Sequence, residues 1–395
     1  MAMATLPSYQ DDMQAVRLLD QVLEAAVAQR ASDLHFEPYS QTYRIRFRID
    51  GVLHEHQQLA LALKERLTAR LKVLAQLDIA ERRIPQDGRM AYTCSNGTVV
   101  DLRVSTLPTL FGEKIAVRIL ESPQHLLTLQ QLGYHKKDLQ LLLQAIERPQ
   151  GMVLVTGPTG SGKTQTLYGC LRHLNQTHRH IASVEDPCEI PLTGINQVHV
   201  NDKAGLDFAS VLRAFLRQDP DVLMVGEIRD ATTADIALKA AQTGHLVLST
   251  LHTNTALAAI TRLRHMGIAP WQLVASLQLL TAQRLVRTLC PQCKREVRPD
   301  AAQQHVAESL SLEGGTLYEA VGCAHCHGGY LGRTGIYQIA RMTSELQQLV
   351  IEEAPMVALE TCARQQGMAS LREAGWHLAW TGATSWQEIM AITDG

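Results

Sequence analysis

The sequence predicts an α/β protein in two parts: a small mixed α/β domain, then a mostly parallel sheet that carries a glycine-rich loop. From about residue 148, the short apolar strands MVLVT, IASVE, VLMVG and LVLST alternate with helical patterns. This alternation is typical of a parallel sheet covered on both faces. The first of these strands runs directly into the glycine-rich stretch GPTGSGKT. In the first part, TYRIRFRIDGVLHEH alternates and breaks at Asp50-Gly51, which indicates a β-hairpin.

The elements of the first part follow from periodicity. Helical spacing predicts an amphipathic helix from residue 11 to about residue 34, with Val16, Leu19, Leu23 and Val27 on one stripe. Residues 60–77 return to helical spacing, and GTVVDLRVSTLPTLFGEKIAVRIL then predicts two strands around a loop. We place the end of this domain at residue 125 and interpret ESPQHLLTLQQLGY as the linker.

Composition excludes several classes of protein. The 395-residue chain has a net charge of −2. Proteins that bind the nucleic-acid backbone usually carry excess positive charge, so the overall charge does not support nucleic acid as the main partner. The N-terminus does not have the pattern of a signal peptide, and no apolar run approaches the ~20 residues that span a bilayer. We therefore expect a cytoplasmic protein that reaches a membrane only through a partner.

The stretch GPTGSGKT matches the phosphate-loop pattern GxxxxGK[ST] between a strand and a helix. Glycines let backbone N–H groups surround a phosphate, and the following helix adds its positive end. We expect Lys163 to reach the β- and γ-phosphates of ATP, and Thr164 to ligate Mg²⁺. The alternative is an ordinary glycine-rich turn. The expected nucleotide-binding residues are Gly157, Pro158, Thr159, Gly160, Ser161, Gly162, Lys163 and Thr164.

Polar side chains stand at the carboxyl ends of the predicted strands, where open parallel sheets bind their ligands. Glu227 follows VLMVG, and Gly226 occupies the place where a phosphate-loop enzyme usually has a magnesium-binding aspartate. We expect Glu227 to orient or deprotonate the attacking water. The alternative is that Glu227 caps the next helix. Glu185 or Asp186, at the end of IASVED, is expected in the outer shell of Mg²⁺.

Two histidines flank the strand LVLST. Seven residues of extended chain separate them by about 23 Å, so both cannot touch one phosphate. His252, at the carboxyl end, is the better candidate for sensing the γ-phosphate. For His245, a structural role and a functional role both stay open.

Two pairs of arginines are candidate phosphate or interface contacts. Arg103 and Arg118 are expected to lie opposite each other if the hairpin turns near Leu110 to Gly112, and an anion would relieve their repulsion. The alternatives are two solvated arginines, or pairing with Asp101 and Glu113. Arg213 and Arg217, one helical turn apart, fit a subunit interface or a solvated face.

Four cysteines form the pairs CPQC and CAHC, which offer a closed tetrahedral thiolate site that favours structural Zn²⁺. The alternative is free thiols or a redox pair. The isolated Cys94, Cys170, Cys188 and Cys362 are expected to be inert core residues. The proposed zinc ligands are Cys290, Cys293, Cys323 and Cys326.

At this point the motifs resemble a known family. GPTGSGKTQTLY, SVEDPCEI, LRQDPDVLMVGEIRDATTADIALKAAQTGHLVLSTLHTN, QRLVRTLCPQC and GRTGIYQIA are similar, in order, to the ATPases that drive type II secretion and type IV pilus assembly. The upstream ASDLHFEP, RFRIDGVL and RVSTLPTLFGEKIAVRIL resemble the same family. The resemblance covers about residues 12–395.

The resemblance implies a PAS-like domain at 1–125, a linker and the start of the ATPase domain at 126–147, a RecA-like core at 148–285, a cysteine metal module at 286–335 and a helical subdomain at 336–395. It also implies a homohexamer at the inner membrane that acts on a platform protein and associated pilus or secretion components. In the family, arginines matching Arg103 and Arg118 contact the γ-phosphate, and those matching Arg213 and Arg217 are associated with the active site or subunit contacts.

Two departures bear on this resemblance. Members often carry a further N-terminal domain that docks onto a membrane-anchored partner, whereas this chain begins close to the second domain. The metal module is typical of assembly and secretion members, which argues against pilus retraction. Two other functions stay open: a RecA-like motor on nucleic acid, which the near-neutral charge disfavours, and a nucleotide-gated scaffold whose turnover is incidental.

Overall fold

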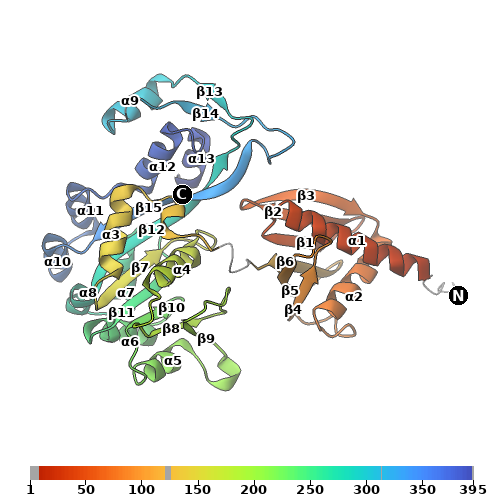
Figure 1. Cartoon of the computed structure of the whole chain (residues 1–395), viewed down its shortest axis with the longest axis horizontal. Helices are drawn as coiled ribbons and strands as arrows, with labels where there is room; N and C mark the ends of the chain where they lie inside the picture. Colours follow the sequence, from red (N-terminus) through yellow and green to blue (C-terminus); the bar gives the residue numbers. More distant parts are fainter. Residues whose placement is uncertain (1–8, 121–125, 313, 394–395) are drawn as a thin grey trace. The chain divides into compact units, whose positions relative to one another are not determined.

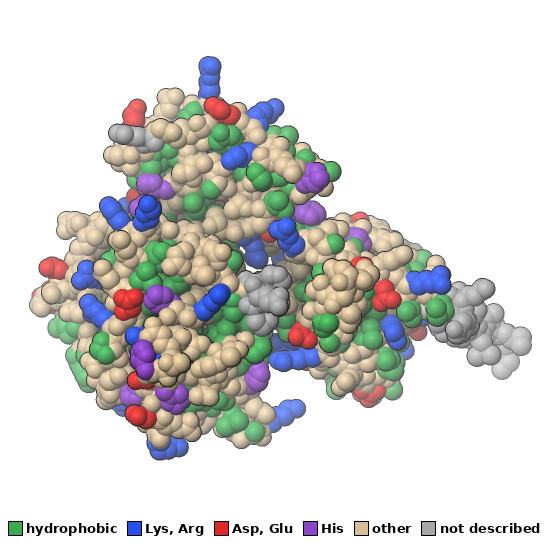
Figure 2. Space-filling view, viewed as in Figure 1, with side chains coloured by type: hydrophobic (Ala, Val, Ile, Leu, Met, Phe, Trp, Pro, Cys, Tyr) green, Lys and Arg blue, Asp and Glu red, His purple; other side chains and the backbone are tan. Residues whose placement is uncertain are grey.

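The computed structural model describes residues 9–120, 126–312 and 314–393. The chain divides into two compact units, Met1–His125 and Leu126–Gly395, both drawn in Figure 1. On the face shown in Figure 2, Lys and Arg side chains are interspersed with Asp and Glu. Within the described ranges, no helix is both long and apolar enough to cross a membrane.

The first unit is a six-stranded antiparallel sheet with the order β3-β2-β1-β6-β5-β4. Its strands alternate buried and partly exposed residues, as in YRIRFRI, so one face packs into a core with the helices. The elements are α1 Tyr9–Ala28, β1 Asp33–Pro38, β2 Tyr43–Ile49, β3 Val52–Leu59, α2 Lys64–Leu74, β4 Gln86–Thr93, β5 Val99–Thr109 and β6 Gly112–Ile119.

The prediction of a helix to about residue 34 was wrong at its C-terminal end. The helix α1 ends at Ala28, and Arg30 has a left-handed backbone with φ 55°. Residues 33–38 form β1, which pairs with both β2 and β6 in the middle of the sheet. The helical stripe also differs in detail, because Leu19 and Leu23 are buried whereas Val16 and Val27 are only partly buried.

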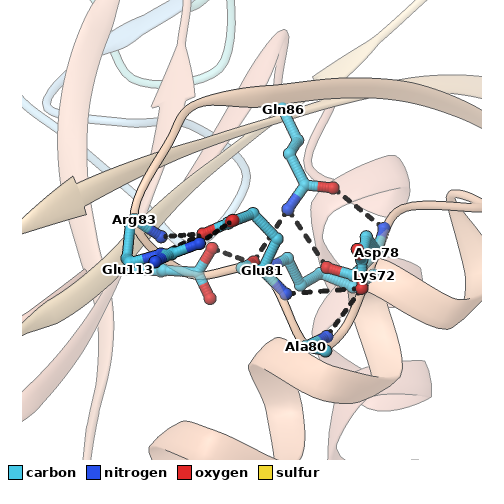
Figure 3. A network of polar contacts seen from close by, with 7 residues as sticks. All are labelled: Lys72, Asp78, Ala80, Glu81, Arg83, Gln86 and Glu113. Carbon is cyan, nitrogen blue, oxygen red and sulfur yellow. Dashed lines mark hydrogen bonds and ion pairs between the residues drawn. The ribbon is translucent and has the colours of Figure 1, made fainter.

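A buried ion pair ties α2 to β6 in this unit (Figure 3). Lys72 is completely buried, and its Nζ lies 2.7 Å from Oε1 of Glu113. The same ammonium donates to the carbonyl of Glu81 at 2.5 Å. Gln86 Nε2 donates to the carbonyls of Asp78 and Glu81, so the network also fixes the segment between α2 and β4.

The second unit is built on a seven-stranded sheet with the order β15-β12-β7-β11-β10-β8-β9. All neighbouring strands are parallel except β15, which is antiparallel to β12. The four predicted strands are confirmed as β7 Gly151–Thr156, β8 Ile181–Glu185, β10 Val222–Val225 and β11 Leu246–Leu251. The strands β9 Asn196–His199, β12 Leu277–Leu289 and β15 Tyr330–Arg341 were not predicted.

Helices cover both faces of this sheet, as the sequence predicts. Met152 and Leu154 of β7 face a core shared with α5 to α8, α10 and α11, whereas Val153 and Val155 face α3 and α4. These helices are α3 Lys136–Ile146, α4 Lys163–Leu174, α5 Phe208–Phe215, α6 Ala231–Gln242, α7 Ala258–His265, α8 Pro270–Ser276, α10 Ser344–Ile351 and α11 Met356–Gln365.

The strands β12 and β15 form a long antiparallel pair, and the cysteine segment lies between them in the sequence. The segment predicted at 286–335 therefore starts inside β12 and ends inside β15. It contains β13 Arg295–Val297, α9 Ala301–Ser309 and β14 Leu317–Glu319, and the tail adds α12 Leu371–Trp380 and α13 Trp386–Thr393.

The linker predicted at ESPQHLLTLQQLGY is only partly a connection. Residues 121–125 lie outside the described residues. Leu126, Leu129 and Leu132 are buried in the core of the second unit. The second half of this stretch is thus part of the folded unit.

Candidate nucleotide-binding site

The glycine-rich loop joins β7 to α4 in the middle of the parallel sheet. Gly162 caps α4 with φ 88°, and Gly157 has φ 147°. A Cβ on Gly157 would lie 2.5 Å from Oγ of Ser161 and 2.6 Å from the carbonyl oxygen of Gln283. Only glycine therefore fits at the start of the loop, and the backbone turns tightly toward the N-terminus of α4.

The lysine of the loop folds back onto it. Lys163 Nζ donates to the carbonyls of Gly157 at 2.9 Å and Pro158 at 3.0 Å. Burial lowers the pKa of Lys163 to about 8, while the charge of Glu227 raises it and that of Arg284 lowers it. Thr164 is exposed in the first turn of α4, where its hydroxyl is open to a ligand. The loop thus presents a cation and a hydroxyl at a helix N-terminus, which is a favourable place for a phosphate and its metal.

Glu227 and His252 come together at the carboxyl ends of β10 and β11. His252 Nε2 lies 3.5 Å from Oε2 of Glu227, whose other oxygen pairs with Arg229. The side chain of Glu227 is 20% exposed, so it is accessible but not fully solvated. The alternative that Glu227 caps the next helix is wrong, because Asp230 caps α6 by accepting from the N–H of Thr233.

Glu185 is buried at the end of β8 and strongly hydrogen-bonded. It accepts from the hydroxyl of Tyr168, from Ser183 Oγ at 2.7 Å and from Gln197 Nε2 at 3.2 Å. Burial and the neighbouring Glu185 raise the pKa of Tyr168, so this tyrosine stays a proton donor. A catalytic or outer-shell role for Glu185 stays a prediction.

The other predicted residues near the strand ends have partners of their own. Asp186 pairs with Arg229 at 3.1 Å. His245 Nδ1 lies 3.0 Å from the carbonyl of Ala240, at the end of α6, which favours a structural role.

Sequence reasoning missed Gln283 and Arg284 on β12. Gln283 is buried, donates to the carbonyl of Ser161 at 2.7 Å and accepts from Thr166 Oγ1 at 2.9 Å. Arg284 donates to the carbonyl of Gln283 and to Asn254. The available signal was an adjacent Gln-Arg pair within the mostly apolar strand LQLLTAQRLV.

In the first unit, Arg103 and Arg118 lie directly opposite each other, and the turn falls at residues 110–111 as predicted. Arg118 pairs with an acid that sequence reasoning did not consider, because its Nε donates to Asp33 Oδ1 at 2.9 Å. Asp33 belongs to β1, the strand that sequence reasoning missed. Arg89 on β4 stands opposite Arg103, so arginine positions on three adjacent strands form a row across the sheet.

The second pair of arginines lies at the end of α5. Arg217 follows the helix, and its Nη1 donates to the carbonyl of Arg213 at 2.8 Å. Arg213 lines a hollow with Asp186, Arg229 and Asp230. Arg213 thus lies close to the strand ends that carry Glu185 and Glu227.

The four cysteines of the two CxxC pairs gather as predicted. The sulfur atoms of Cys290, Cys293, Cys323 and Cys326 all lie within 4.8 Å of one another, a group that could hold one metal ion. Thiolate ligands alone favour zinc or an iron–sulfur cluster over harder cations. Among the other cysteines, Cys94 and Cys170 are buried, and Cys362 is partly buried and packs against the core of the second unit. Cys188 is only partly buried, so the prediction of a core position was wrong for this residue.

Comparison with known proteins decides the family. The family of type II/IV secretion system proteins matches residues 8–391. The type IV pilus assembly ATPase PilB of Pseudomonas aeruginosa is 50% identical over 391 residues, which is 97% of this chain and 68% of that protein. This chain belongs to the type II/IV secretion system family. The predicted resemblance is confirmed, and with it the assignment to ATPases.

Further relatives in the type II/IV secretion system family include the type II secretion system ATPase E of Vibrio cholerae. It is 47% identical over 385 residues, covering 97% of this chain and 76% of that protein. Among solved structures, the ATPase DotB of Legionella pneumophila superposes with a TM-score of 0.69 at 20% identity, over 95% of each chain. The pilus retraction motor PilT superposes with a TM-score of 0.61 at 24% identity, over 94% of this chain and 96% of that one. At these identities the likeness shows the fold.

Proposed function

We propose that this chain is a motor ATPase that hydrolyses ATP and powers type IV pilus assembly or type II secretion. The observation that carries the proposal is the meeting of a phosphate loop with Glu227 and His252 at one edge of the sheet. The names and coverage of the relatives support the same function. The protein would act in the cytoplasm, at the inner membrane, through a platform protein and other pilus or secretion components.

Each predicted site residue has a proposed role. The loop residues from Gly157 to Thr164 bind the phosphates, with Lys163 at the β- and γ-phosphates and Thr164 as a ligand of Mg²⁺. Bound Mg²⁺ would neutralise charge on the phosphates. Glu227 orients or deprotonates the attacking water, and His252 senses the γ-phosphate. Glu185 supports this edge through its buried hydrogen bonds.

The remaining proposals concern the oligomer, the zinc site and the domain boundaries. We propose a homohexamer in which Arg103 and Arg118 of a PAS-like first unit contact the γ-phosphate, and Arg213 and Arg217 contribute to the active site or subunit contacts. Four thiolates at Cys290, Cys293, Cys323 and Cys326 would bind one structural Zn²⁺. The domain boundaries are proposed as 1–125, 126–147, 148–285, 286–335 and 336–395.

The proposal is tested with the purified chain. We expect magnesium-dependent ATP hydrolysis that is lost in Lys163→Ala and is not stimulated by DNA. Strong stimulation by DNA that falls with salt would favour a nucleic-acid motor instead. In cells, Glu227→Gln should abolish pilus assembly or secretion, whereas normal function in that variant would favour a nucleotide-gated scaffold.

A further inference from the structure

Arg284 reaches across the start of the phosphate loop. Its strand, β12, pairs with β7 on one side, with Ala282 opposite Thr156. The strand β11 pairs with β7 on the other side, with Leu251 opposite Thr156. Arg284 Nη1 donates to the carbonyl of its neighbour Gln283 at 3.0 Å, and its Nη2 donates to Asn254, beyond β11, at 3.1 and 3.3 Å. The guanidinium therefore extends from one flank of β7 to the other, at the edge where the loop begins.

The charge of Arg284 is not neutralised by a neighbour. Within the described part of the chain, no carboxylate lies in ion-pairing distance of its guanidinium, and its acceptors are carbonyl and amide oxygens. Arg284 is partly buried, and this burial lowers its pKa. Arg229, at the same edge of the sheet, differs because Glu227 and Asp186 both pair with it.

A second cation shares this space. Lys163 Nζ donates to the carbonyl of Gly157, and a Cβ on Gly157 would lie 2.6 Å from the carbonyl oxygen of Gln283, which accepts from Arg284. Burial lowers the pKa of Lys163 most, the charge of Glu227 raises it, and the charge of Arg284 lowers it to a smaller extent. Glu227 offsets part of this repulsion but already pairs with Arg229, so an additional anion would favour the charged forms of both Lys163 and Arg284. A phosphate with several negative charges would relieve both, and a guanidinium matches phosphate oxygens in a fork-like geometry.

We propose that Arg284 contacts the terminal phosphate of the nucleotide bound in its own subunit, alongside Lys163. The terminal phosphate is indicated because Asn254, which Arg284 reaches, lies two residues beyond His252, and His252 lies 3.5 Å from Glu227. Glu227 is the group proposed for the attacking water, and His252 is the group proposed to sense the γ-phosphate. Arg284 would exchange its neutral acceptors for phosphate oxygens when ATP binds. The inference rests on the proposed ATPase function.

The test compares ATP-state and ADP-state affinities. In Arg284→Gln, we expect the affinity for a non-hydrolysable ATP analogue to fall about 10- to 100-fold, while the affinity for ADP changes less than about threefold. We expect kcat to fall more than KM rises, because the contact strengthens as charge develops on the transferred group. Arg284→Lys should show a smaller loss of the same selectivity. Binding is measured by calorimetry and turnover by phosphate release.

Two matched variants separate this contact from a positioning role. Asn254→Ala removes the side-chain acceptor of Arg284 but keeps the cation, and should retain the preference for the ATP analogue. Arg298→Gln makes the same charge change at an exposed residue and should bind both nucleotides as the wild type does. Equal losses of both affinities in Arg284→Gln, or no loss, would overturn the inference. So would Asn254→Ala if it reproduced the loss of selectivity.

The outcome also separates this inference from the proposed function. A wild type that does not bind or hydrolyse ATP overturns both. A wild type that hydrolyses ATP, and loses this activity in Lys163→Ala but not in Arg284→Gln, overturns the inference alone. If Arg284→Gln does not fold, as judged by circular dichroism, Arg284→Lys carries the test, and an unchanged selectivity in that variant overturns the inference.

Discussion

Replacing Glu227 with glutamine should separate nucleotide binding from hydrolysis. The substitution keeps the size of the side chain and removes its negative charge. A positioned base contributes about 10²- to 10⁴-fold to a rate, so kcat should fall by that factor, which corresponds to about 2.7–5.4 kcal/mol of transition-state free energy. Nucleotide affinity should change little, because the loop and Lys163 are untouched.

The structure also predicts the cost of Glu227→Gln to stability. Arg229 is 56% exposed and keeps Asp186 as a partner at 3.1 Å. His252 is 51% exposed and can be solvated when it loses its acidic neighbour. Exposed ion pairs contribute little, so the free energy of unfolding should change by less than about 1 kcal/mol. A fall in kcat therefore cannot be explained by unfolding.

The assay combines phosphate release, calorimetric binding of an ATP analogue and thermal unfolding. Arg229→Gln is the matched control, because it removes the partner of Glu227 but leaves the carboxylate in place, and its kcat should fall less. Turnover in Glu227→Gln within about threefold of the wild type would refute the assignment of this carboxylate. Loss of analogue binding in a folded Glu227→Gln protein would refute the separation of binding from hydrolysis.

Three further predictions follow from the geometry. The pKa of Lys163 is lowered to about 8, and nucleotide binding favours the charged lysine, so binding should take up protons above about pH 8 and almost none below pH 7. Nucleotide affinity should therefore fall as the pH rises above 8. Calorimetry in buffers of different ionisation enthalpy measures the proton uptake, and equal uptake at both pH values would contradict the prediction. Cys293→Ser should lose bound metal and make residues 286–335 sensitive to proteases, whereas the control Cys362→Ser should keep the metal. Elemental analysis measures the metal content of both variants. Metal retained in Cys293→Ser would contradict the proposed metal site. Lys72→Met should destabilise the first unit by about 3–5 kcal/mol, because it leaves Glu113 buried without its partner. The double variant Lys72→Met/Glu113→Leu should recover most of that loss. Hydrogen exchange of β5 and β6 measures the stability of both variants, and a double variant as unstable as the single one would contradict the reasoning.

Much of the second unit could be predicted because its signals are local. A buried parallel strand such as β7 is a continuous apolar run, and the loop that follows must supply glycines at Gly157 and Gly162. The CxxC spacing likewise brings each cysteine pair together within one turn. These features depend on neighbours in sequence, so the sequence was sufficient to predict them.

The missed features depend on partners distant in the chain. Asp33 pairs with Arg118 across 85 residues, and the strand that carries it, DLHFEP, is only six residues long, so its alternation is a weak signal directly after a long helical pattern. Arg89 joins the arginine row only through the register of β4 with β5. Gln283 supports the loop from 122 residues away. Such contacts follow from sheet order and register, which a single sequence does not specify.

The antiparallel pairing of β12 with β15 mechanically connects the phosphate loop with the cysteine segment. Gln283 touches the phosphate loop, and seven residues later the same strand reaches Cys290. That separation is about 23 Å of extended backbone, and most of this stretch is hydrogen-bonded to β15. A paired ribbon of this kind is stiff to stretching, so a displacement of the cysteine segment would be transmitted along β12 to the phosphate loop. A partner bound at the cysteine segment could in this way alter the loop from a distance.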